Sequence, residues 1–384
     1  MFLALDDFVA HVVVDAPAAI IPADDVPLLM LHSIGTSLGV FDPQVTALAR
    51  TRRVIRMDMR GHGLSGVTAG DYSMALHAAD AFKVLDVLGI RQAHVLGMSI
   101  GGRIALQMAA MAPARVASLI LFDTALEFPP PEAWQERIDA VMARGTVALA
   151  DVVMPRWVVD PTRPDSLGLR QMLLRTDRVG YAGSAAALRD ARAAEIIGKV
   201  NCPTTVVVGD LDVATPPETA REIVAAIPGS RYVEVAGGAH LIALERAQAA
   251  TEAIRAHFAA LAPEQGAEAG LAMRKAVLGE AHVARAQGNV TDLDAAFQDW
   301  ITANVWGGIW TRPGLSRHQR SLLCLGMMAA LGRHEEFELH VRATRNTGVT
   351  PDEIAEVLLQ VGAYAGVPAA NSALKIAKAV LKEG

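Results

Sequence analysis

The sequence has little of what several classes of protein need. Its 384 residues include two cysteines, Cys202 and Cys324, which cannot build a disulfide framework or a four-ligand zinc site and which fit a reducing compartment. Lys and Arg number 35 against 41 Asp and Glu, so the chain lacks the basic footprint of a nucleic-acid-binding protein. The longest apolar runs, such as 116–122, are strand-length and far short of the roughly 20 residues that span a membrane. Acidic residues stand near the start where a signal peptide would carry Lys or Arg, so we expect a cytoplasmic protein.

What the sequence does contain is globular, with 52% hydrophobic and 20% charged residues. The first part alternates short β-branched runs with helical patterns, which predicts a layered α/β fold around a mostly parallel sheet. Near-continuous apolar strands of this kind are typical of a sheet that is covered on both faces. The expected strands are 28–32, 53–58, 93–97, 116–123, 204–209 and 231–235, and the expected helices are 73–88, 101–112, 217–226 and 245–260.

Two segments depart from this alternation. Residues 129–200 show helical pattern without a strand, which predicts a helical cap inserted into the α/β domain. The apolar pattern lapses near 262–270, where we expect a linker, and strand signals disappear after it. We therefore expect an α/β domain over 1–262 and a small all-α domain over 263–384. The helices expected in the second domain are 270–287, 291–304, 316–331, 334–346, 351–363 and 368–382.

The pentapeptide at 97–101 reads Gly-Met-Ser-Ile-Gly and matches the pattern G-x-S-x-G. It follows an expected strand and precedes an expected helix, which is the strand–turn–helix setting that this motif requires. Small residues at 97 and 101 allow a turn tight enough to hold the Ser99 hydroxyl above the edge of the sheet. Ser99 is therefore the candidate nucleophile, and the alternative is a glycine-rich turn without chemistry.

A serine hydroxyl needs a base to take its proton and a carboxylate to orient that base. His240 follows the expected strand 231–235, and Asp212 follows the strand 204–209, so both lie at the edge where α/β sites are built. Asp210 is a nearby competitor for the acid, and Asp123 is a weaker one. The order Ser, Asp, His along the chain agrees with a serine hydrolase on a parallel sheet.

A tetrahedral intermediate also needs two backbone N–H donors for its oxyanion. We expect these from Ile100, the residue after the nucleophile, and from Ile34 in the loop 32–36. An ordinary β–α turn is the alternative interpretation of that loop.

Residues 58–65 (Asp-Met-Arg-Gly-His-Gly-Leu-Ser), together with the Ser99, Asp212 and His240 segments, make residues 25–260 resemble the α/β-hydrolase superfamily. The segment 31–44 more narrowly resembles the 3-oxoadipate enol-lactonases. This resemblance implies that Ser99 attacks a lactone carbonyl and that His240 shuttles the proton. The N-terminal segment 1–26 departs from the expected polar hairpin, which leaves the first strands open.

An enol-lactone substrate carries a free carboxylate, so a cation is expected near the pocket. Trp134 and Arg137 lie one helical turn apart in the cap and are candidates for a wall and a charge of the substrate site. A tryptophan that packs inside the cap and a solvated arginine are the alternative interpretation.

In the second domain, the segments 304–316, 331–342 and 348–369 resemble the 4-carboxymuconolactone decarboxylases, over residues 270–384. The wider superfamily includes alkylhydroperoxidase-like proteins with a Cys-x-x-Cys before a helical histidine. His340 matches that histidine, while Arg333 and Glu336 stand at the cysteine positions, which excludes dithiol chemistry. We expect these three side chains on one face of a helix, with Arg333 stabilising a dienolate, His340 acting as an acid and Glu336 orienting one of them. A salt-bridged surface face is the alternative. The resemblance alone makes Arg312, Glu356 and Trp306 further candidates for the decarboxylase site.

The two resemblances together imply a bifunctional enzyme of aromatic-acid breakdown through protocatechuate and β-ketoadipate. The decarboxylase would make the enol-lactone that the hydrolase opens to 3-oxoadipate, with lactones as small-molecule substrates and without metal or cofactor. The alternative is a general carboxylesterase or lactonase whose second domain is a non-catalytic oligomerisation module. In either case we expect a homo-oligomer that assembles through the C-terminal domain and binds neither nucleic acid nor membrane.

Overall fold

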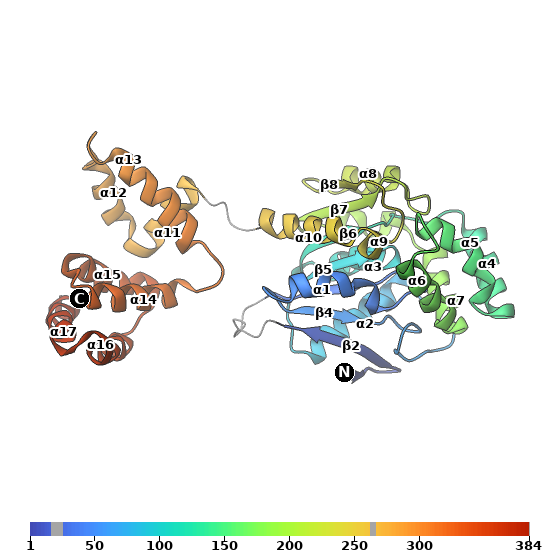
Figure 1. Cartoon of the computed structure of the whole chain (residues 1–384), viewed down its shortest axis with the longest axis horizontal. Coiled ribbons are helices and arrows are strands. Elements are labelled where there is room, and N and C mark those ends of the chain that lie inside the picture. The colour runs from blue at the N-terminus through green and yellow to red at the C-terminus, as the bar shows by residue number, and fades with distance from the viewer. Residues whose placement is uncertain (17–25, 262–265, 384) are drawn as a thin grey trace. The chain divides into compact units, whose positions relative to one another are not determined.

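The computed structural model describes residues 1–16, 26–261 and 266–383 of the chain. It has two compact units, Met1–Leu261 and Ala262–Gly384, which are described separately (Figure 1). Residues 17–25 of the N-terminal segment and residues 262–265 of the expected linker lie outside the described residues. In the described ranges, no helix is long and apolar enough to cross a membrane.

The first unit is built on an eight-stranded sheet with the order β1-β2-β4-β3-β5-β6-β7-β8. Strands β3 to β8 pair in parallel with one another, as the sequence predicted, and β3 to β7 are almost entirely buried. Two antiparallel strands precede them. β1 pairs with β2, and β2 joins the sheet by pairing with β4, where Val12 lies opposite Met57. The strands are β1 (Phe2–Ala4), β2 (Val9–Asp15), β3 (Leu28–Leu31), β4 (Val54–Met57), β5 (Ala93–Met98), β6 (Val116–Phe122), β7 (Thr204–Gly209) and β8 (Arg231–Val235).

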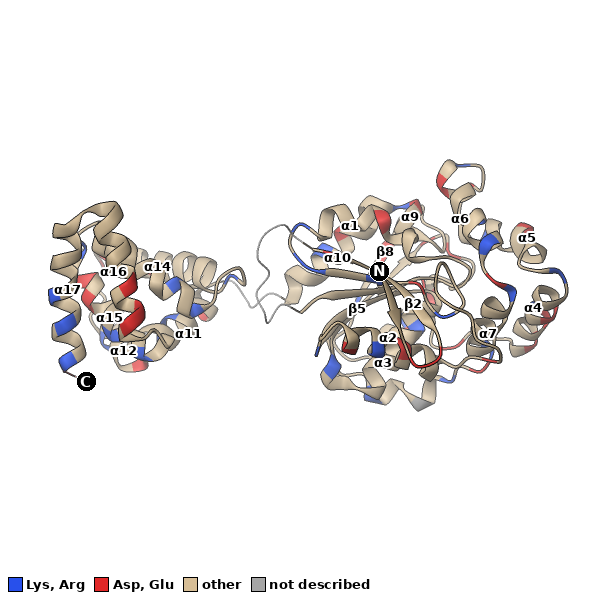
Figure 2. Cartoon of the chain, turned by 90° about the horizontal axis from the view of Figure 1, so that it is seen from below, with Lys and Arg blue, Asp and Glu red and all other residues tan. Residues whose placement is uncertain are grey.

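Helices cover both faces of this sheet, so its apolar strands form one large buried core. In Figure 2 the sheet lies between α1 and α10 on one side and α2 and α3 on the other, and each of these pairs is in contact. A parallel sheet covered by helices on both faces is the arrangement that the alternating strand and helix patterns predicted. The helices outside the cap are α1 (Asp42–Leu48), α2 (Met74–Val87), α3 (Ile100–Met111), α8 (Pro217–Ala226), α9 (Ile242–Glu245) and α10 (Ala247–Leu261), with short 3-10 turns η1 (Leu38–Phe41) and η2 (Pro113–Arg115).

Between β6 and β7, all the regular elements in the described residues are helices or 3-10 turns. The helices gather at one end of the first unit in Figure 1 and contribute buried side chains to the same core as the sheet. They are α4 (Pro131–Arg144), α5 (Val147–Trp157), α6 (Pro164–Arg175) and α7 (Arg178–Arg189), followed by the 3-10 turns η3 (Ala193–Glu195) and η4 (Ile197–Lys199). We call α4 to α7 the cap.

Helices are also the only regular elements in the described part of the second unit, which has apolar cores of its own. The single helix expected over 270–287 is two helices, because Gly279 has a left-handed φ of +88° that interrupts the pattern. The helix expected over 291–304 begins at Ala295 and continues in π geometry to Trp310. The elements are α11 (Ala267–Leu278), α12 (Glu280–Gly288), α13 (Ala295–Trp300), the π-helical η5 (Ile301–Trp310), α14 (Arg317–Ala330), α15 (His334–Thr347), α16 (Pro351–Ala365) and α17 (Val367–Lys382).

Candidate active site

Ser99 occupies a strained turn between β5 and α3. Its φ of 56° and ψ of −119° lie outside the regions that most side chains adopt. The turn depends on glycine on both sides: a Cβ on Gly97 would lie 2.1 Å from the carbonyl oxygen of Gly101, and a Cβ on Gly101 would lie 2.1 Å from that of Leu31. The geometry is that of a nucleophile elbow, which presents the Ser99 hydroxyl at the end of the sheet.

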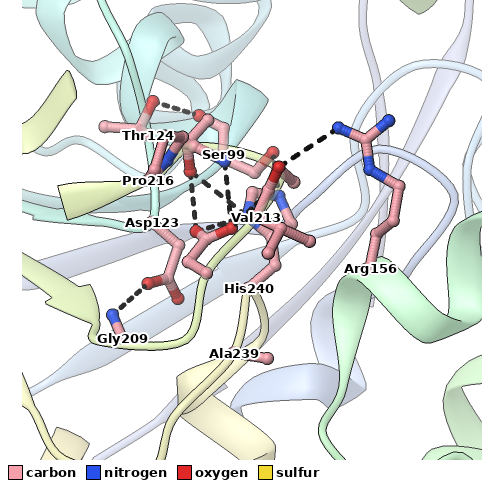
Figure 3. A network of polar contacts seen from close by, with 12 residues as sticks. Ser99, Asp123, Thr124, Arg156, Gly209, Val213, Pro216, Ala239 and His240 are labelled. Atoms are coloured by element: carbon pink, nitrogen blue, oxygen red, sulfur yellow. Dashed lines mark hydrogen bonds and ion pairs between the residues drawn. The ribbon is translucent and has the colours of Figure 1, made fainter. Parts of the chain in front are cut away.

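A chain of two hydrogen bonds joins the three side chains that the sequence singled out (Figure 3). The Nε2 atom of His240 lies 2.9 Å from Ser99 Oγ, and its Nδ1 atom lies 2.8 Å from Asp212 Oδ2. All three side chains are buried. When Nδ1–H donates to the carboxylate, Nε2 is free to accept the serine proton, which is the arrangement of a general base.

Asp212 is held as a carboxylate by its surroundings. Its Oδ1 accepts the backbone N–H groups of Ala214 and Thr215, and its Oδ2 accepts the Thr215 hydroxyl at 2.8 Å. Burial opposes ionisation, but the positive charge and hydrogen bond of His240, together with the bonds from Thr215, outweigh it and lower the pKa of Asp212. Asp210, the competitor in the sequence, is exposed. Thr215 was missed because nothing in the local sequence ties it to the acid.

Asp123 serves neighbouring backbone groups and not the histidine. It has a positive φ of 44° and is completely buried, and its two oxygens accept the N–H groups of Gly209 and Ile242 at 3.0 and 3.2 Å. Burial, and then the negative charge of Asp212, raise its pKa well above the usual value. Asp123 therefore ties the end of β7 to the segment that follows His240, whereas the carboxylate that bonds to the imidazole is that of Asp212.

The loop that carries His240 is fixed on both sides of the imidazole. The N–H of Ala239 donates to Glu245 Oε2 at 3.0 Å, and the N–H of Leu241 donates to the carbonyl of Trp157 at the end of α5. The other oxygen of Glu245 accepts the N–H of Val159 at 2.6 Å. The contacts made by Leu241 and Glu245 join this part of the chain to the end of α5 and the segment after it, which are distant in the sequence.

The two residues expected to form an oxyanion hole flank the nucleophile. Ile100 begins α3 directly after Ser99, and Ile34 lines the cavity above the serine. Across the described ranges, neither backbone N–H donates a hydrogen bond to another protein group. The loop of Ile34 is anchored by His32, whose Nε2 accepts the N–H of Met59 at 2.9 Å.

Above Ser99 and His240 is a cavity of about 360 Å³ whose outer wall comes from the cap. Trp134 and Arg137 both line it, and the guanidinium of Arg137 lies 4.6 Å from the centre of the Trp134 ring. Arg156, which the sequence analysis missed, is a second cation on this wall and donates to the Val213 carbonyl at 3.3 Å (Figure 3). Burial, and then the charge of Arg137, lower the pKa of Arg156. Two guanidinium groups on one wall favour a negatively charged ligand.

In the second unit, His340 is the buried member of the predicted set. It lies on α15, and its ring stacks on Trp310 with 6.2 Å between centroids. Its Nδ1 atom has no hydrogen-bond partner among the residues that the structure describes. Burial, and then the neighbouring His282, lower the pKa of His340 to about 4, so the imidazole is neutral at pH 7. A neutral imidazole can donate a hydrogen bond through its ring N–H.

The expectation that Arg333, Glu336 and His340 share one helical face is wrong for Arg333. The helix α15 begins only at His334, because Gly332 has a left-handed φ of +67° and Arg333 has the non-helical angles of an N-cap. Glu336 is one turn from His340 on the helix, but both Glu336 and Arg333 are exposed, whereas His340 is 7% exposed. The structure therefore does not gather these three side chains in one buried site.

Comparison with known proteins gives a separate match for each unit. Residues 26–150 match the family model described as alpha/beta hydrolase fold, and residues 295–379 match the carboxymuconolactone decarboxylase family. A 4-carboxymuconolactone decarboxylase of Acinetobacter baylyi is 46% identical over 120 residues, which cover 31% of this chain and 90% of the relative. The 3-oxoadipate enol-lactonase 1 of the same organism is 32% identical over 198 residues, which cover 50% of this chain and 74% of the relative.

A solved structure agrees with the match of the first unit. The enol-lactonase from Burkholderia xenovorans LB400 aligns with a TM-score of 0.64 and 31% identity, covering 67% of this chain and 100% of that structure. The fold class predicted from the sequence is thereby confirmed. The chain belongs to the α/β-hydrolase family in its first unit and to the carboxymuconolactone decarboxylase family in its second, joined in one polypeptide.

Proposed function

We propose that this chain is a bifunctional enzyme that decarboxylates 4-carboxymuconolactone to 3-oxoadipate enol-lactone and then hydrolyses the enol-lactone to 3-oxoadipate. The observation that carries the proposal is the joining of two units similar to enzymes of consecutive steps, since the product of one is the substrate of the other. This places the chain in the β-ketoadipate pathway. A cytoplasmic location is part of the proposal, because the free thiols Cys202 and Cys324 fit a reducing compartment.

Hydrolysis of the enol-lactone follows from the geometry around Ser99. His240 Nε2 takes the hydroxyl proton as Ser99 Oγ attacks the lactone carbonyl, and the oxyanion accepts the N–H groups of Ile34 and Ile100. The ring C–O bond breaks, and the imidazolium returns the proton to the enolate leaving group, which becomes the ketone. Water then attacks the acyl-serine with His240 as base, which releases 3-oxoadipate and restores the hydroxyl.

The cap supports this substrate. The enol-lactone carries one carboxylate, and we assign its binding to Arg137 and Arg156, with Trp134 as an apolar wall. This position would direct the lactone ring towards Ser99, because the cations and the nucleophile line the same cavity of about 360 Å³.

Decarboxylation needs an electron sink and a group that stabilises the resulting charge. The unsaturated lactone is its own sink, and loss of CO2 leaves a dienolate that is protonated at carbon. We assign the stabilising hydrogen bond to His340, whose neutral imidazole is buried beside Trp310 and keeps Nδ1 unused by the described residues. Arg333 and Glu336 are exposed at the start of α15, and we assign no step to them.

The second candidate function is a general esterase or lactonase whose second unit is a non-catalytic oligomerisation module. One surface of that unit favours oligomerisation. The groove between α14 and α16 has a volume of about 750 Å³, and its lining includes the exposed apolar side chains of Leu323, Met327 and Tyr364. Large exposed apolar patches mark interfaces in soluble proteins. We propose that the chain forms a homo-oligomer through this groove, which is compatible with either function.

The function is tested by following 4-carboxymuconolactone in the ultraviolet with the wild type, Ser99→Ala and His340→Ala. We expect the wild type to form 3-oxoadipate, Ser99→Ala to stop at the enol-lactone, and His340→Ala to consume little starting lactone. His334→Ala, which removes an exposed histidine of the same helix, is the matched control. A wild type that hydrolyses simple esters but leaves 4-carboxymuconolactone unchanged would favour the second candidate, and normal decarboxylation by His340→Ala would refute the role of that residue.

A further inference from the structure

The second unit contains a buried cation that the proposed chemistry has not used. Arg274 lies on α11 with 8% of its surface exposed. Its Nη1 atom donates to two neutral acceptors, Gln298 Oε1 at 3.1 Å and Thr302 Oγ1 at 3.4 Å. Its Nε atom is buried and has no acceptor among the described residues. Burying a guanidinium with neutral partners alone is unfavourable, so a buried cation of this kind favours an anionic ligand.

Arg274 also lines a cavity that could hold such a ligand. The cavity has a volume of about 490 Å³ and is bounded by residues of α11, α12, α13 and η5, including Gln298 and Thr302. Two carboxylates, Glu268 and Asp299, line it as well, but both residues are exposed, and in the described part of the chain neither forms an ion pair with Arg274. The guanidinium is thus fixed in direction by two neutral side chains and retains unpaired donor capacity at a cavity.

This cation lies in the same neighbourhood as His340. Val277, three residues after Arg274 on α11, packs in one apolar cluster with Trp306 and Trp310, and Trp310 stacks on His340. The charges also interact. After burial and Arg285, Arg274 contributes to lowering the pKa of His282, and His282 in turn contributes to lowering that of His340. Arg274 is thus linked to the histidine assigned to decarboxylation through Trp310 and His282, although His340 itself does not line the cavity.

We propose that Arg274 binds the substrate carboxylate that decarboxylation leaves in place. This inference rests on the proposed function, in which 4-carboxymuconolactone has one carboxylate that leaves and an acetate carboxylate that stays. A cation on the leaving carboxylate would stabilise the ground state more than the transition state, in which that charge moves into the lactone. A cation on the retained carboxylate holds the substrate equally in both states and positions the ring beside His340.

The electron balance leaves Arg274 outside the covalent chemistry. The bond between the lactone carbon and the departing carboxylate breaks and CO2 leaves. The electron pair of that bond enters the conjugated carbonyl to form the dienolate, and a proton taken up at carbon from solvent water gives the enol-lactone. Arg274 donates hydrogen bonds throughout and exchanges no proton. Its loss should therefore raise KM and leave kcat little changed.

The test compares decarboxylation by the full chain as wild type, Arg274→Gln, Arg274→Lys and Arg317→Gln, the last removing an exposed arginine at the start of α14. The two substrates are 4-carboxymuconolactone and its methyl ester at the acetate carboxylate. We expect Arg274→Gln to raise KM for the dicarboxylate about 10- to 100-fold, as for a lost charged hydrogen bond. We also expect it to lose the preference of the wild type for dicarboxylate over ester. Arg274→Lys should be intermediate, and Arg317→Gln should match the wild type.

The outcomes separate the inference from the function. If Arg274→Gln keeps the wild-type KM, or keeps the preference for the dicarboxylate while kcat falls, Arg274 does not bind the retained carboxylate. If Arg274→Gln fails to fold by circular dichroism, Arg274→Lys decides, because an unchanged preference in that variant overturns the inference. A wild type that releases no CO2 refutes the proposed decarboxylase itself, and that result requires no substitution.

Discussion

Several histidines of the first unit are buried in a neutral state, which makes its stability depend on pH. His77 on α2 is 3% exposed and pairs with the Ser184 hydroxyl at 3.2 Å. Burial, and then the positive charge of Arg60, lower its pKa from 6.5 to about 3. The unfolded chain binds a proton at this residue below pH 6.5, whereas the folded protein does so only near pH 3. The contribution of His77 to stability is therefore present above pH 6.5 and is lost as the pH falls towards 3.

We predict that protonation of His77 in the unfolded chain lowers the free energy of unfolding of the first unit by about 2 kcal/mol as the pH falls from 7 to 5. Denaturant unfolding at the two pH values measures this loss. His77→Gln removes the titrating group, so its difference between pH 7 and pH 5 should be smaller than that of the wild type by about this amount. An identical pH dependence in the two proteins would show that His77 does not carry the effect.

At the level of single residues, the sequence was informative where chemistry follows a motif. Ser99 was identified from its glycine setting, and His240 and Asp212 from their positions after strands, and the structure joins the three by hydrogen bonds. Arg156 and Glu245 were missed, because their partners lie on segments that only the fold brings near. Arg333 was expected on the helical face of His340 although the expected helix began at 334, and the structure places it at the N-cap, after the left-handed Gly332.

Glu245 connects two elements, because it binds the loop of His240 and the segment after α5 with one carboxylate. In Glu245→Gln, one of these backbone N–H groups faces an NH2 group in place of an oxygen. We predict that kcat/KM for the enol-lactone falls about tenfold, which corresponds to the loss of one hydrogen bond to a charged group. Decarboxylation by the second unit should not change.

The matched control for this position is Glu252→Gln, which alters an exposed glutamate on α10. Steady-state hydrolysis of the enol-lactone by the two variants measures the difference. If Glu245→Gln hydrolyses the lactone as fast as Glu252→Gln does, the contact between the cap and the histidine loop does not position His240.

Among elements, the parallel strands were predictable because continuous apolar runs with turn signals are specific for a sheet covered on both faces. The antiparallel strands β1 and β2 were left open, because β1 has only three residues and β2 gains its place by pairing with β4. The π-helical η5 was not predictable either, since its backbone geometry is not set by hydrophobic periodicity. The end of α15 lies one residue beyond the expected end at 346, because Gly348 adopts the left-handed conformation of a C-cap.

At the scale of the whole molecule, the proposed assembly depends on the groove between α14 and α16. Leu323 and Met327 are each about half exposed and Tyr364 is 88% exposed, so apolar area remains to be covered. Burying one such side chain contributes about 1.5–3 kcal/mol, and a carboxylate in its place would oppose association.

We therefore predict that the wild type sediments as an oligomer in analytical ultracentrifugation and that Met327→Glu shifts it towards the monomer. Leu293→Glu is the matched control, because Leu293 is 96% exposed and lies outside the lining of the groove. Both variants add the same charge, so only the location of the carboxylate differs between them. A wild type that sediments as a monomer, or a Met327→Glu protein that associates as strongly as Leu293→Glu, would contradict assembly through this groove.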